Sequence, residues 1–148
     1  MSPRETLLAA VVECLTAIAI ADGYNTDAGA LATTELGQVA DDATAALSAT
    51  LVRQVRATDP GKARTHRLTE IGVVIKVPVS FDNAQERLDL AVSDIERAME
   101  ATPANQARFP CGYDYPQYAE MRPLNPEQGA AAGWIGALVL YQSHIPIR

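Results

Sequence analysis

Two clusters of side chains have the types and spacing that a binding surface needs. The first is basic and surrounds one turn, where Asp59 is the only opposing charge in the stretch. It holds five of the twelve Lys and Arg residues: Arg53, Arg56, Lys62, Arg64 and Arg67. Two interpretations stay open, a solvated hairpin tip and an arm that grips an acidic neighbour or passing DNA. In both of them the side chains act through their charge.

The second cluster is aromatic and lies in a proline-rich segment. Four of the eight aromatic residues fall within ten positions. They are Phe109, Tyr113, Tyr115 and Tyr118. Such rings can stack on a sugar or a base, but they more often anchor a loop to its own domain or to another subunit. We expect anchoring here.

Catalytic and metal-binding motifs are missing from the sequence. It has no GxSxG elbow, glycine-rich phosphate loop, HExxH pair or EF-hand spacing. His66 and His144 stand alone in their stretches, and the pair Asp41-Asp42 is typical of a solvated turn. Cys14 lies beside an apolar stripe and is expected to be an inert core thiol. We therefore expect no catalytic residue, no metal site, no cofactor and no enzymatic activity.

Length and composition favour one folded, soluble domain over residues 1–148. A chain of 148 residues with 48% hydrophobic and 20% charged residues can bury one core. The net charge of −6 disfavours a general affinity for nucleic acid or for anionic membranes. No apolar run is long enough to span a bilayer, and Glu13 interrupts the one stretch that looks like a signal peptide. Cys14 and Cys111 form no CxxC motif, which suits a reducing cytosol.

The first third of the chain predicts a helix followed by less regular structure. Ser2-Pro3-Arg4-Glu5 has the form of a capping box, so a helix should begin there and stop at Gly23. Its apolar stripe would consist of Leu8, Val11, Val12, Leu15 and Ile18. Residues 24–37 predict a turn and a short extended piece. Residues 45–55 fit both a helix and a half-buried strand, and periodicity leaves that choice open.

Residues 71–79 and 82–100 give the clearest pattern. The β-branched residues of 71–79 alternate as in a strand, and Asp82 is predicted to cap a second helix, with Gln85 reaching back. The buried stripe of this helix would be Leu88, Val92, Ile95 and Met99. Its opposite face is mainly acidic and carries Glu86, Asp89, Glu96, Arg97 and Glu100.

The last third of the chain predicts an irregular region and a final strand. Prolines concentrate between residues 102 and 133, where only a short edge strand is expected, at residues 118–122. Residues 134–145 then predict a strand. The order of these elements favours an α+β fold in which two helices pack on a mainly antiparallel, mixed β-sheet.

The order of elements and several short strings resemble the tail terminator proteins of long-tailed phages. The resemblance covers nearly the whole chain. Its strings are Tyr24-Asn25-Thr26-Asp27-Ala28-Gly29, the extended Ile71 to Val79, Asp82 leading into Leu88-Asp89, Ser93-Asp94-Ile95-Glu96, and Leu138-Val139-Leu140-Tyr141. In that family the ambiguous residues 45–55 would form a strand paired with residues 71–79.

The resemblance implies a structural protein of the virion, assembled in the host cytoplasm. Such a protein forms a hexameric ring that caps the tail tube, stops its polymerisation and joins it to the head connector. Its partners would be copies of itself, the tail tube protein and the connector protein. Genomic DNA would pass through the ring without sequence-specific binding. A ring of this kind needs two different side surfaces that match, and the basic cluster and the acidic helix face could be that pair.

Two other functions stay open at this point. The chain could be another structural subunit of the phage neck or tail, such as a tube or head-completion protein. It could also be a small ligand-binding or enzymatic α+β domain, with a pocket at the tyrosine-rich segment.

Overall fold

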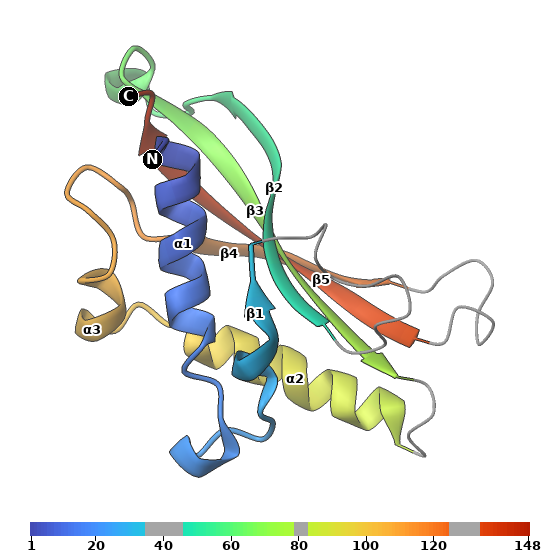
Figure 1. Cartoon of the computed structure of the whole chain (residues 1–148). Helices are drawn as coiled ribbons and strands as arrows, with labels where there is room; N and C mark the ends of the chain where they lie inside the picture. Colours follow the sequence, from blue (N-terminus) through green and yellow to red (C-terminus); the bar gives the residue numbers. More distant parts are fainter. Residues whose placement is uncertain (35–45, 79–82, 125–133) are drawn as a thin grey trace.

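The computed structural model describes residues 1–34, 46–78, 83–124 and 134–148. In this part of the chain the long helices pack on one face of a five-stranded mixed sheet (Figure 1). The N-terminal half contains α1 (Pro3–Leu15), the 3-10 turns η1 (Ile20–Asp22) and η2 (Ala28–Leu31), β1 (Ala32–Thr33), β2 (Ala46–Arg56) and η4 (Pro60–Lys62). The rest contains β3 (His66–Pro78), α2 (Ala84–Ala98), α3 (Pro103–Gln106), β4 (Gln117–Leu124) and β5 (Trp134–Pro146).

The sheet has the order β1-β2-β3-β5-β4. The short β1 is parallel to β2, and the other neighbouring strands are antiparallel. The prediction of an α+β fold with helices on a mainly antiparallel, mixed sheet is confirmed.

The stretch that fitted both a helix and a strand is a strand. In β2, Leu47 and Ala49 lie opposite Ile75 and Val73 of β3 and are fully buried. Ser48 between them is buried as well, so burial does not alternate along this segment. The segment is a strand because the neighbouring strand satisfies its backbone groups.

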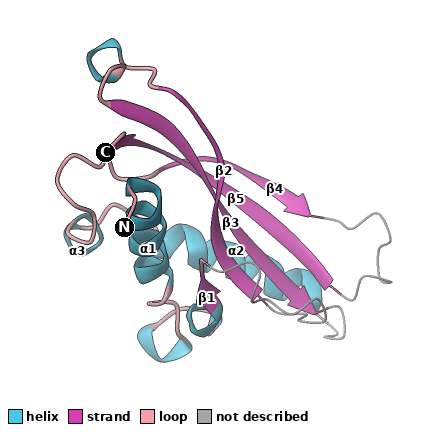
Figure 2. Cartoon of the chain, turned by 45° about the horizontal axis from the view of Figure 1, so that its top comes forward, coloured by secondary structure: helices cyan, strands magenta, loops and turns pink. Residues whose placement is uncertain are grey.

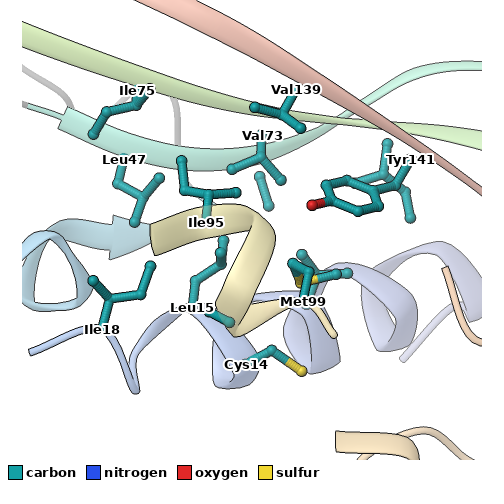
Figure 3. Close-up of a cluster of buried hydrophobic side chains, with 14 of the residues drawn as sticks. Cys14, Leu15, Ile18, Leu47, Val73, Ile75, Ile95, Met99, Val139 and Tyr141 are labelled. Atoms are coloured by element: carbon teal, nitrogen blue, oxygen red, sulfur yellow. The ribbon is translucent and has the colours of Figure 1, made fainter. Parts of the chain in front are cut away.

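The core lies between the helices and the central strands β3 and β5 (Figure 3). Ile71, Val73, Ile75 and Val77 are buried as the alternation predicted. The final strand also forms where expected. Both of its edges are hydrogen-bonded, to β3 and to β4, so it is a central strand of the sheet.

The first helix begins as predicted and ends earlier. The backbone N–H of Glu5 donates to Ser2 Oγ at 3.2 Å, and Ser2 N–H donates to Glu5 Oε2 at 2.8 Å, which completes the capping box. The helix ends at Leu15, and Gly23, with φ of 89°, closes η1 instead.

The predicted stripe of this helix was partly wrong. Its buried residues are Leu7, Ala10, Val11, Cys14 and Leu15, whereas Leu8 and Val12 are only half-buried. Apolar residues surround most of this helix, so its sequence cannot say which side meets the sheet.

The second helix buries the stripe predicted for it. Leu88, Val92 and Ile95 are buried, and so is Met99, which follows the last helical turn. Asn83 occupies the cap position, and the predicted cap, Asp82, lies outside the described residues, as does the pair Asp41-Asp42.

The proline-rich region is more ordered than predicted where the structure describes it. Thr102 caps the short helix α3. The predicted edge strand is confirmed and is longer than expected, since β4 runs from Gln117 to Leu124. Residues 125–133 lie outside the described part of the chain.

A buried carboxylate joins the loop after α1 to α2. Asp94 is 1% exposed, and its two oxygens accept four hydrogen bonds. The backbone and side-chain nitrogens of Asn25 donate to Oδ1 at 3.0 and 3.1 Å, and the backbone N–H and hydroxyl of Thr26 donate to Oδ2 at 2.8 and 2.7 Å. All these donors would lose a charged partner if the carboxylate were absent.

The same loop has two more fixed points. Arg97 donates to the carbonyl of Gly23 at 2.7 Å and lies over the ring of Tyr24, 4.5 Å from its centroid. Gly29 lies so close to the end of α1 that a Cβ there would be 2.6 Å from the carbonyl oxygen of Ile18. The loop therefore fixes how α1 and α2 pack together.

The Asp94→Asn variant should lower the free energy of unfolding by about 2–3 kcal/mol, because the amide keeps the size but leaves donors of the loop without an acceptor. Urea denaturation followed by circular dichroism measures this. The exposed Asp89→Asn on the same helix is the matched control and should stay within about 0.5 kcal/mol of the unmodified protein. Equal stability of both variants would contradict the role given to Asp94.

Candidate functional site

The basic cluster forms the tip of the β2–β3 hairpin. Arg53 and Arg56 lie near the end of β2, Lys62 belongs to η4, Arg64 lies in the turn after it, and Arg67 is the second residue of β3. The tip extends past the helices, beside the chain termini (Figure 2). Ile147 donates to the carbonyl of Thr65 at 3.0 Å, so the C-terminal residues brace this turn.

Two of the five cations are neutralised within the chain. Arg53 bonds Glu70 of the neighbouring strand through two contacts, Nε to Oε2 at 3.0 Å and Nη2 to Oε1 at 3.2 Å. Lys62 Nζ lies 2.7 Å from Asp114 Oδ2. Sequence reasoning missed both acids because they lie outside the basic stretch, and only the strand register brings Glu70 opposite Arg53.

The other three cations make no ion pair with the described residues. Arg56 and Arg64 are exposed, and Arg67 is half-buried. Arg56 and Arg67 are directly opposite each other in the register, a like-charge pairing that disfavours the hairpin. Arg67 also lines a small cavity of about 250 Å³ with Arg4 of α1. This end of the molecule therefore has uncompensated positive charge.

The acidic face of α2 lies away from this tip. Glu86, Asp89, Glu96 and Glu100 are all exposed, and none of them has an ion pair within the described ranges. Asp89 accepts a hydrogen bond from Gln85 at 3.2 Å. Figure 1 shows α2 along the end of the sheet opposite the β2–β3 turn. One copy of the chain therefore does not bring the predicted basic and acidic residues together.

Part of the aromatic cluster anchors the segment to its own domain. Phe109 is buried and meets Tyr115 edge to face, with ring centroids 5.2 Å apart. The Tyr115 hydroxyl donates to the carbonyls of Met99 and Glu100 at 2.8 and 3.0 Å, so it satisfies the C-terminal end of α2. Burial raises the pKa of Tyr115, and it also raises the pKa of the neighbouring Cys14 thiol.

Tyr118 differs from these rings because it is 53% exposed. It meets the buried Tyr141 edge to face at 6.0 Å, beside a groove of about 610 Å³. The groove lies between the C-terminal end of α2 and the start of β4. Its lining includes Glu96, Met99, Glu100, Tyr115, Tyr118 and Tyr141. The sequence could not reveal this groove, because the residues come from segments that only the fold joins.

The histidines join the hairpin to the proline-rich segment. His66 Nε2 lies 3.0 Å from the carbonyl of Gly112. His144 Nε2 accepts from the backbone N–H of Thr58 at 3.3 Å, and its Nδ1 lies 3.6 Å from Asp114 Oδ2. The Thr58 hydroxyl is 3.4 Å from the same Nε2. This distance is longer than the roughly 2.6–3.2 Å that separates a catalytic nucleophile from its general base. These contacts fit a structural role.

Two further properties concern the described residues as a group. They contain no cluster of three or more His, Cys, Asp or Glu side chains placed to hold a metal ion. None of the helices in the described ranges is long and apolar enough to cross a membrane.

The fold and surfaces define an α+β protein with two helices on one face of a mixed sheet, a basic hairpin tip and an acidic helix face. Comparison with protein-family models gives no match, and comparison with curated proteins gives none either.

The Arg53–Glu70 pair has a testable dependence on pH. The hydrogen bond from Arg53 lowers the pKa of Glu70, so the pair stabilises the fold above the unfolded pKa of about 4.3. That stabilisation is lost as the pH falls through the lower, folded pKa. In Arg53→Gln, the pKa of Glu70 should rise towards its ordinary value, as an NMR titration of the side-chain carboxyl would show. Arg56→Gln should leave it unchanged, and a similar rise there would contradict the assignment.

Proposed function

We propose that this chain is a ring-forming structural subunit of a phage tail, a tail terminator. The observation that carries the proposal is the separation of charge. Three arginines at the hairpin tip, three carboxylates on α2 and Glu100 just after it have no ion pair among the described residues of their own chain. A head-to-tail ring needs two different and complementary surfaces on every copy, and these two surfaces meet that requirement.

The residues that carry the family resemblance also support this proposal. Asn25 and Thr26 of one string bond directly to Asp94 of another, and residues 71–77 and 138–141 lie side by side in the sheet. These strings are therefore parts of one packed unit. Residues with such roles suit a family whose function is structural.

In this role the chain closes into a ring of six on the growing tail tube and stops its polymerisation. Its other face receives the head connector, and genomic DNA passes through the lumen. A net charge of −6 suits a lumen that repels phosphate and binds no particular sequence. The ring would be assembled in the host cytoplasm and remain in the virion.

A second candidate function rests on the groove beside Tyr118. Aromatic walls and nearby carboxylates are common in sites that bind small molecules, so the chain could be a ligand-binding domain. A tube or head-completion subunit is the remaining structural alternative. A stable monomer that binds a small molecule in the groove would favour the first alternative, and long helical tubes of the purified chain would favour the second.

Electron microscopy with tail tubes of the cognate tube protein tests the terminator function. The free chain should sediment as a monomer at micromolar concentration, because exposed ion pairs each contribute only about 0.2–1 kcal/mol. Added to tubes, it should form a disc at one end and halt elongation. Binding along the whole tube, or none, would contradict the proposal.

The Arg64→Glu variant should lose this end-binding while its free energy of unfolding changes by less than about 0.5 kcal/mol, because Arg64 is exposed and makes no ion pair with the described residues. Arg108→Glu gives the same change of charge away from the hairpin tip and should still cap the tubes. If the Arg64→Glu variant still limits tubes to normal length, the basic cluster has no role in binding and is only a solvated hairpin tip.

A further inference from the structure

We propose that the groove beside Tyr118 binds the guanidinium group of Arg64 from a second copy of this chain. This inference rests on the proposed ring and names the contact at each junction. The β2–β3 turn, which contains Arg64, lies away from α2 and from the start of β4, which form the groove, so the contact joins the tip of one copy to the groove of the next (Figure 1).

The groove has the two kinds of wall that hold a guanidinium. Glu96 of α2 and Glu100, two residues beyond the end of this helix, both line it, and neither has an ion pair with the described residues. The rings of Tyr118 and Tyr141 lie edge to face on the side formed by β4 and β5. A planar cation can stack on such a ring while its N–H groups donate to carboxylates.

The buried tyrosine adds a polar group to this lining. Tyr141 is 3% exposed, and its hydroxyl makes no hydrogen bond with another residue in the described part of the chain. Burial, together with the negative charge of Glu96, raises the pKa of Tyr141, so the phenol stays neutral.

Arg64 is the cation best placed to enter the groove. Arg53 and Lys62 are held by Glu70 and Asp114, and Arg67 is half-buried. Arg56 is exposed, but it belongs to the strand β2, directly opposite Arg67, and not to the turn. Arg64 lies in the turn at the apex of the hairpin and is exposed. The contact is head to tail, so repetition of it produces a closed ring or a filament.

Charge alone would also allow the arm to bind the other half of the acidic face. There Glu86 and Asp89 are exposed, and Asp89 is already bonded by Gln85. The groove differs in offering aromatic surface, which strengthens the binding of a cation when water is excluded. This difference allows a matched experiment.

Disulfide trapping locates the contact while Arg64 and both glutamates stay in place. In a Cys111→Ala background, Thr65→Cys lies next to Arg64, and Gln117→Cys lies in the groove lining. Thr65→Cys with Gln85→Cys is the matched control at the other half of the helix, where Glu86 and Asp89 also stay in place. Each pair is oxidised at high protein concentration and again on tail tubes, then separated without reductant, after melting temperatures have shown that the variants fold.

The groove pair should give a ladder of linked chains that ends at a closed oligomer, and the control pair should give none. Arg64→Glu in the groove pair should abolish the ladder, and adding Glu100→Arg should restore it. A ladder from the control pair alone would overturn the groove assignment and leave the ring intact. The groove assignment would also be overturned if neither pair gives a ladder, either free or on tubes. The terminator function is tested separately, by the capping of tubes.

Discussion

The packing of the two long helices depends on one buried carboxylate. Asp94 projects from α2 and takes up all four donors that Asn25 and Thr26 direct at it. A charged group in an apolar interior is tolerated only when it is bonded in this way. The loop that it holds connects α1 to the edge of the sheet. The positions of both helices, and therefore of the acidic face and the groove, follow from this contact.

The basic hairpin tip and the acidic face of α2 lie apart on the surface, and packing of the core does not require this arrangement. Intramolecular bonds hold Arg53 and Lys62, which fixes the shape of the hairpin, and leave Arg56 and Arg64 exposed at its tip. Tyr115 bonds the end of α2 and so fixes the groove near Glu100. Rigid placement of both surfaces lowers the entropy lost when two copies associate.

Local patterns predicted the elements well, and contacts between distant residues explain what they missed. The capping box, the β3 alternation and the α2 stripe each depend on neighbours in sequence. The buried face of α1 depends on how it meets the sheet, and residues 46–56 form a strand because β3 pairs with them. The candidate sites also include Glu70, Asp114 and Tyr141, which are distant in sequence and come close only in the folded chain. Asp94 stood on the predicted helix, but nothing in its spacing showed that donors from residues 25 and 26 would reach it.

The position of β5 in the sheet has a consequence for how the chain is made. It is the last strand in sequence, yet it lies between β3 and β4 and bonds both of them. During synthesis, β3 therefore has one unpaired edge, and β4 has no partner, until the residues after Trp134 leave the ribosome. Such an edge can pair with other chains, so early folding intermediates are exposed to aggregation.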